Sequence, residues 1–98
     1  MASLFPFEIL TPEQVFYSGS ISSLVAPQME GYFGVLAHHV PLIARSGGGK
    51  LKIREASGEE HLFQIGPGII EVSKNRAVVL TRKVETIPGE TKQAPSIG

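Results

Sequence analysis

Short runs of β-forming residues, broken every few positions by glycine or proline, dominate the chain and leave no segment with a helical period. The clearest run is residues 50–54, where two aliphatic side chains alternate with three cations. Residues 5–9 alternate in the same way, with Phe or Ile at every second position. Such alternation is typical of strands that have one buried face. The pattern therefore predicts an all-β fold, a small sandwich or flattened barrel.

Turn signals divide the chain into these short strands. Glycine and proline mark sharp turns, and asparagine tolerates positive φ. We expect breaks at Thr11–Glu13, Ser18–Ser20, Pro27, Ala56–Glu59, Gly66–Gly68 and Asn75. After Glu85 the sequence becomes rich in proline and glycine. This predicts one β-sandwich domain over residues 1–85 and a flexible tail over residues 86–98.

Composition excludes several classes of protein. Nine basic and nine acidic residues balance, so no strong field would steer nucleic acid or anionic lipid. Cysteine is absent, which removes disulfides, thiolate metal sites and cysteine nucleophiles. No apolar run approaches the ~20 residues that span a bilayer, and the first ten residues lack the basic start of a signal peptide.

Two segments invite a catalytic or ligand-binding interpretation. The glycine-rich SGGGKL, residues 46–51, lacks the first glycine and the Ser or Thr of a phosphate loop, so we expect a turn before a strand. His38 and His39 are adjacent, and adjacent strand residues point to opposite faces, so they chelate one ion poorly. With only His61 besides, we predict no metal site and no catalytic site.

The cations Lys50, Lys52 and Arg54 form a stripe on one strand face. A stripe of this kind can follow a nucleic acid backbone. Single-strand binding would normally add aromatic side chains for base stacking, and none alternates with these cations. The stripe is thus a solvated face, or a contact for an acidic protein surface.

Three ordered segments carry a resemblance to a known family. They are FEILTPEQVFYSG at 7–19, EGYFGVLAHHVPLI at 30–43 and GIIEVSKNRAVVL at 68–80. Together they closely resemble the epsilon subunit of F-type ATP synthases, over roughly residues 5 to 82. The family pattern includes Glu-Gly-x-x-Gly-Val-Leu-x-x-His-x-Pro, which the second segment matches in full.

The resemblance implies a fold and a role. The fold would be two stacked antiparallel sheets of about ten short strands. The role would be that of a central-stalk subunit in a rotary, proton-translocating ATP synthase, without a catalytic site of its own. Its partners would be the gamma subunit and the ring of c subunits, with alpha and beta reached through the complex. The protein would be peripheral to the cytoplasmic face of a bacterial inner membrane, or alternatively to the stromal side of a plastid thylakoid.

Family positions map onto individual residues of this chain. The positions that face gamma correspond to Thr11, His39 and Ala44. The loop that meets the c-ring corresponds to Glu30, Gly31, Tyr32 and Gly34. Tyr32 stands where many relatives have an acid, so this chain departs from a charged contact with the ring.

The C-terminal part departs furthest from the family. Members typically continue into two helices that inhibit ATP hydrolysis and sometimes bind ATP, whereas no helical pattern follows residue 85 here. We therefore expect no nucleotide site, no cofactor and no hairpin-based inhibition. The alternative function is a stand-alone β-barrel that binds an oligonucleotide or small ligand, and a third is a metalloenzyme using His38, His39 and His61.

Overall fold

The computed structural model describes residues 3–38 and 40–88 of the chain. Within these ranges the regular structure is entirely β, with no helix and hence none long and apolar enough to cross a membrane. The strands are β1 (Phe5–Leu10), β2 (Val15–Gln28), β3 (Gly31–Leu36), β4 (Leu42–Ser46), β5 (Gly49–Glu55), β6 (Glu60–Ile65), β7 (Gly68–Ser73), β8 (Arg76–Thr81) and β9 (Val84–Thr86). The all-β prediction is confirmed.

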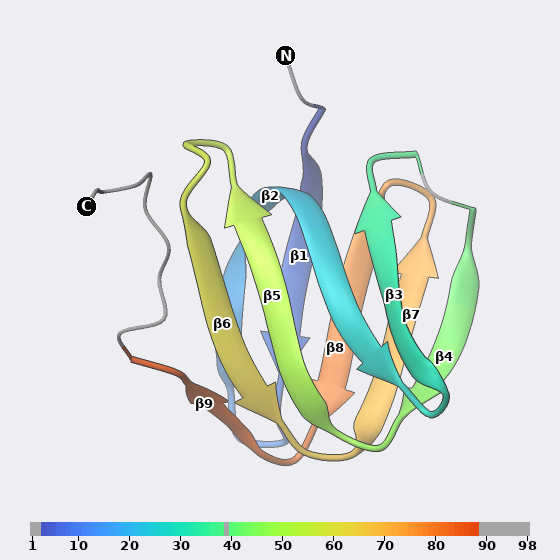
Figure 1. The fold of residues 1–98 in the computed structure, drawn as a ribbon, viewed down its shortest axis with the longest axis vertical. Coiled ribbons are helices and arrows are strands. Elements are labelled where there is room, and N and C mark those ends of the chain that lie inside the picture. Colours follow the sequence, from blue (N-terminus) through green and yellow to red (C-terminus); the bar gives the residue numbers. More distant parts are fainter. Residues whose placement is uncertain (1–2, 39, 89–98) are drawn as a thin grey trace.

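Two layers are built from one continuous set of strands, because β2 belongs to both (Figure 1). Its first half pairs with β1, in the layer β4-β7-β8-β1. Its second half pairs with β3 on one side and with β5 on the other, in the layer that continues through β6 to β9. Nine strands thus replace the expected ten or so, since β2 serves each layer in turn.

The predicted break at Ser18–Ser20 is wrong, and so is the predicted stop at Pro27. Residues 18–20 pair with Glu8, Phe7 and Pro6, and the strand continues to Gln28. A register shift lies between Ile21 and Ser23, where β2 passes from one layer to the other. Small residues suit such a bend, and Ser22 lies at it, so the corner comes just after the serine–glycine run, which itself belongs to the strand.

All but one of the strand pairs are antiparallel, as expected. The exception is the parallel pair of β1 and β8, in which Phe7 is opposite Ala77 at one end and Leu10 is opposite Leu80 at the other. The pair joins the first strand of the chain to one of the last. A parallel neighbour distant in sequence leaves no turn signal, so nothing local in the sequence indicates it.

The core lies between the layers and follows the period-two pattern. The predicted alternation in β1 and β5 is confirmed, because the odd-numbered residues of 5–9 and 51–53 are all buried. The buried hydrophobic residues are Phe5, Phe7, Ile9, Ile21, Leu24, Ala26, Val35, Leu51, Ile53, Phe63, Ile65, Ile70, Val72, Ala77 and Val79.

The predicted turns join the strands where the backbone requires special residues. Asn75 has φ 54° between β7 and β8, as its type predicts. The glycine-rich segment connects β4 to β5, which confirms the expected turn before a strand. Gly48 has φ 100°, and a Cβ there would lie 2.9 Å from the carbonyl oxygen of Ile65. Both the dihedral angle and the close approach require glycine at this position.

Strand β9 was not expected from the sequence. It pairs with β6, and the amide of Ile87 donates to the carbonyl of Leu62 at 3.0 Å. Thr86, which sequence analysis assigned to the tail, therefore lies in the last strand. Residues 89–98 of the expected tail lie outside the described residues.

Candidate functional site: contact surfaces and a polar cluster

The end of the β2–β3 hairpin gathers the residues expected to face the c-ring. Met29 and Glu30 form its two-residue turn, and Gly31 follows with φ 114°. Tyr32 is 58% exposed, and Gly34 is exposed further along β3. We call Met29, Glu30, Gly31 and Tyr32 the hairpin tip. Three of the four predicted residues lie in the tip, and the fourth lies on the strand that leaves it.

The hairpin tip is fixed against the connection between β4 and β5. The amide of Met29 donates to the carbonyl of Arg45 at 3.1 Å. A Cβ at Gly49 would lie 3.4 Å from the hydroxyl of Tyr32, so the absence of a side chain there leaves room for the tyrosine ring. Met29 is 65% exposed and was missed by the sequence analysis. An exposed apolar residue at a hairpin turn was the available signal.

Thr11 follows β1 in a tight turn. It exchanges backbone hydrogen bonds with Gln14 at 2.9 and 3.3 Å, and its side chain bonds to the same residue. Thr11 borders a hollow of about 640 Å³ on the outer side of the first layer. The hollow is lined mainly by apolar side chains: Leu10, Pro12, Pro67, Ile69 and Leu80.

An apolar row crosses the same outer face. Ile69 pairs with Leu80, Leu80 with Leu10, and Leu10 with Val15. Ile69 is 43% and Val15 is 55% exposed. We call these four residues the outer apolar row. The sequence signal was present, because residues 69–70 and 77–80 are apolar without alternation, as in strands covered on both faces.

Ala44 lies away from Thr11. It is on the edge strand β4, and β7 and β8 separate that strand from β1. Ala44 pairs with the buried Ile70, while its neighbours Ile43 and Arg45 are exposed. Side chains alternate along a strand, so Ala44 is on the core side of β4. His39, the third residue expected to face gamma, lies outside the described residues.

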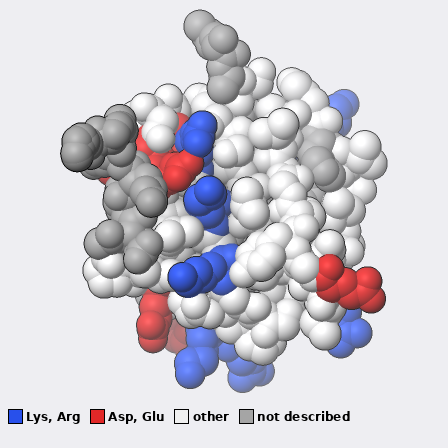
Figure 2. Space-filling view, in the orientation of Figure 1, with Lys and Arg blue, Asp and Glu red and all other residues white. Residues whose placement is uncertain are grey.

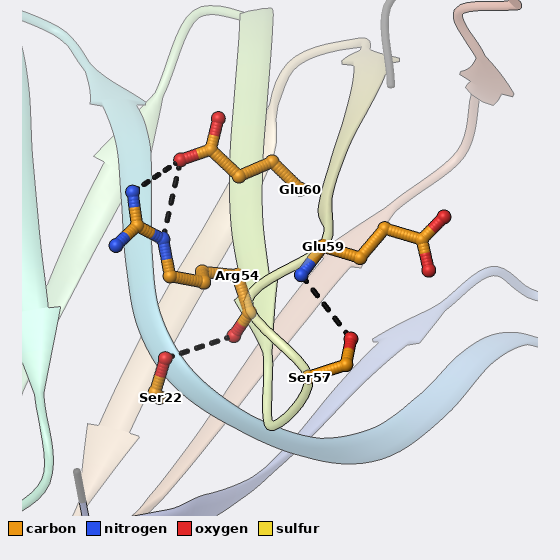
Figure 3. A network of polar contacts seen from close by, with 5 residues as sticks. All are labelled: Ser22, Arg54, Ser57, Glu59 and Glu60. Atoms are coloured by element: carbon orange, nitrogen blue, oxygen red, sulfur yellow. Dashed lines mark hydrogen bonds and ion pairs between the residues drawn. The ribbon is translucent and has the colours of Figure 1, made fainter. Parts of the chain in front are cut away.

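The basic stripe occupies the outer face of β5 in the second layer. Blue side chains follow one line over this layer, and the surface beside it is largely white, with acidic side chains in red at the lower right near the end of the β2–β3 hairpin (Figure 2). Arg54 donates two hydrogen bonds to Glu60, at 2.5 and 3.2 Å (Figure 3). The neighbours of Lys52 across the sheet are Val25 and Leu62. Base-stacking aromatic rings are thus not adjacent to Lys52.

A polar cluster occupies the opposite face of the β5–β6 hairpin. The Nε2 atom of His61 lies 3.4 Å from Glu55 and 3.9 Å from Glu59. We call these three residues the acid–histidine cluster. The hydroxyl of Tyr17 donates to the other oxygen of Glu55 at 2.8 Å. Burial of Tyr17, together with the nearby Glu55 carboxylate, raises the pKa of the phenol well above its usual range.

The histidines expected as a catalytic or metal-binding set do not meet. His38 is in the turn after β3 with φ 67°, whereas His61 is on β6. Strands β2 and β5 separate β3 from β6. One ion cannot contact both histidines across that distance, since ligand atoms lie about 2 Å from a bound zinc.

These features define a two-layer β-sandwich with apolar groups exposed on one outer face and at one hairpin. The chain matches the family "ATP synthase, Delta/Epsilon chain, beta-sandwich domain" over residues 4–87, and it belongs to that family. This confirms the resemblance drawn from the three sequence segments.

Curated relatives carry the name ATP synthase epsilon chain. The protein of Chlorobaculum tepidum is 42% identical over 80 residues, which cover 82% of this chain and 91% of the relative. That of Chlorobium limicola is 39% identical over 80 residues, with the same coverage of 82% and 91%. That of Leptospira borgpetersenii is 41% identical over 73 residues, 74% of this chain but 57% of the relative. The chain therefore spans nearly all of two relatives and little more than half of the third.

Solved structures share the fold at low sequence identity. One is a chain of the Euglena gracilis mitochondrial ATP synthase, in a structure of OSCP, F1 and c-ring. It matches with TM-score 0.81 and 16% identity, over 88% of this chain and 55% of the other. The other is from the central stalk and c-ring of the Tetrahymena thermophila enzyme, with TM-score 0.70 and 18% identity, over 86% and 67%.

Proposed function

We propose that this protein is a central-stalk subunit of a rotary, proton-translocating F-type ATP synthase, coupling proton flow to ATP synthesis. The observation that carries the proposal is the family match over residues 4–87, together with relatives named ATP synthase epsilon chain. The fold neighbours come from assemblies described as containing F1, the central stalk and the c-ring. The protein acts by contact, and catalysis belongs to other subunits.

The gamma subunit binds at the outer apolar row and the neighbouring Thr11, in this proposal. Permanent interfaces are more apolar than ordinary surface, and the hollow beside Thr11 is lined mainly by apolar side chains. Ala44 contributes through the edge of β4, where Ile43 is 71% exposed. His39, which lies outside the described residues, completes the expected set.

The c-ring docks on the hairpin tip and on the adjoining Gly34. The tip is exposed, and a large aromatic side chain such as Tyr32 is the type of residue that anchors interfaces. Position 32 carries no carboxylate, so contact with the c-ring depends on the aromatic side chain of Tyr32 and on the charge of Glu30. Through gamma and the c-ring, the protein is linked to the alpha and beta subunits. It is peripheral to the cytoplasmic face of a bacterial inner membrane, or alternatively to the stromal side of a thylakoid.

A pull-down of the tagged chain from its source membranes in mild detergent tests this function. Gamma, alpha, beta and c recovered together support it. Gamma without c supports the stalk assignment and removes the hairpin tip as the ring contact. A chain recovered alone contradicts the proposal. Recovery with nucleic acid, lost as salt rises, would instead favour the oligonucleotide-binding alternative through Lys50 and Lys52.

A further inference from the structure

We propose that the acid–histidine cluster binds one divalent transition-metal ion, with zinc as the best fit. Each of Glu55, Glu59 and His61 offers one ligand atom, and these three atoms all lie within 4.8 Å of one another. Imidazole nitrogen and carboxylate oxygen are both zinc ligands, and catalytic zinc sites use three protein ligands. Neither the family assignment nor the proposed function requires such a site, so the inference stands apart from both.

The hairpin holds the three ligands on one face. The amide of Glu55 donates to the carbonyl of Glu59 at 2.9 Å, which sets these two residues opposite each other. His61 pairs with the buried Ile53, two residues before Glu55, so all three side chains are on the core side of the hairpin. The Glu60 carboxylate binds Arg54, and Figure 3 shows the side chain of Glu59 directed away from it.

The distances already approach those of a tetrahedral site. Zinc bonds of about 2.1 Å place neighbouring ligand atoms about 3.4 Å apart. The separation of His61 from Glu55 is 3.4 Å. Glu59 is 3.9 Å from the imidazole and its side chain is 42% exposed, so a small rotation brings it into place. With three protein ligands, the fourth position of a tetrahedral site is left for water.

Charge favours a cation at this place. Two carboxylates meet a single imidazole, so the cluster stays net negative even when the imidazole is protonated. Among the ion pairs of residues 3–38 and 40–88, neither Glu55 nor Glu59 contacts a lysine or an arginine. Calcium, which takes six to eight oxygen ligands, and magnesium, which prefers an octahedral oxygen shell, both fit this ligand set poorly.

Tyr17 acts as a positioning residue for the site. Its hydroxyl holds one oxygen of Glu55 at 2.8 Å, and the other oxygen faces His61. Hydrogen bonds to a ligating carboxylate fix its orientation, and their loss typically costs 10–100-fold in metal affinity. Tyr17 packs against Phe7 and Phe63, with ring centroids 5.9 and 5.7 Å apart, so its own position is rigid.

Isothermal titration of the full 98-residue chain, without a histidine tag, with zinc chloride tests the site. We expect saturable binding of one ion per chain that an excess of Mg²⁺ does not displace. His61→Gln and Glu59→Gln should each weaken binding about tenfold or more, and Tyr17→Phe about tenfold. The matched control is His38→Asn, which removes another histidine while tolerating the positive φ, and it should bind as the unaltered chain does.

Several outcomes overturn the proposal. Absence of saturable zinc binding reduces the cluster to an ion pair at the end of a hairpin. Undiminished binding by His61→Gln, or binding lost in His38→Asn, moves the ion to the adjacent histidines. Circular dichroism verifies the fold of each variant. If His61→Gln fails to fold, Glu59→Gln decides, because its exposed side chain contributes little to packing.

Discussion

The hydroxyl of Tyr17 donates a 2.8 Å hydrogen bond to the carboxylate of Glu55, and this bond joins the two layers of the sandwich. Tyr17 pairs with Ile9 in the first layer, and Glu55 ends β5 in the second. The tyrosine ring contacts Phe63 of β6 as well, at 5.7 Å between centroids. The bond therefore holds together residues that are 38 positions apart in sequence.

The first prediction concerns alkaline stability. The folded pKa of Tyr17 is raised above its unfolded value of about 10, first by burial and then by Glu55. A raised pKa means that the stabilisation is fully present below pH 10 and declines as pH rises above it. Tyr17→Phe should lower stability by about 1 kcal/mol at neutral pH and flatten this alkaline decline. Urea unfolding at pH 8, 9, 10 and 11 measures both effects. A parallel decline in both proteins would contradict the assignment to Tyr17.

Local patterns account for most of the fold. Leu51 and Ile53 alternate with cations and are buried, and Asn75 takes the positive φ that its type favours. What the sequence concealed depends on contacts between distant elements. The residues Ser18–Ser20 are compatible both with a turn and with a strand that changes layers. Only its partners Glu8, Phe7 and Pro6 decide which of the two it forms.

The candidate surfaces were predictable to different degrees. The hairpin tip follows from the resemblance, because Glu30, Gly31 and Tyr32 are contiguous. The outer apolar row does not, since β1, β2, β7 and β8 each contribute one residue. Sequence analysis also considered His61 only beside His38 and His39. Its neighbours Glu55 and Glu59 become visible once the β5–β6 hairpin is folded.

A second prediction tests the outer apolar row. Ile69→Glu should leave the domain folded, because the side chain is already 43% exposed, yet it should reduce gamma recovery in the pull-down. An unpaired charge buried in an interface costs several kcal/mol, so we expect a loss of at least about tenfold in affinity. The matched control is Gln64→Glu, which adds the same charge to an exposed position of β6 in the other layer. Equal gamma recovery for both variants would remove this row from the interface.

A third prediction separates the two partners. Tyr32→Ala should reduce recovery of c subunits while leaving gamma recovery unchanged, because the hairpin tip and the outer apolar row are on different layers. Removal of a central aromatic anchor typically costs about 2 kcal/mol or more. Tyr32→Phe keeps the ring and serves as the control. Retention of c by Tyr32→Ala would assign ring binding to other residues, and loss of gamma would argue against separate surfaces.

A fourth prediction compares two glycines that share a positive φ but differ in their surroundings. Gly48 has φ 100° and faces the Ile65 carbonyl, whereas Gly58 has φ 94° with nothing within 4 Å of an added Cβ. Gly58→Ala should therefore cost only the conformational penalty, about 1 kcal/mol. Gly48→Ala carries that penalty and a clash at 2.9 Å with backbone that cannot rotate away, so we expect a total of about 2–4 kcal/mol. Urea unfolding of the two variants measures the difference. Equal losses would mean that the connection between β4 and β5 shifts to admit the methyl group. The space that Gly49 leaves for the Tyr32 ring would then also change with that shift.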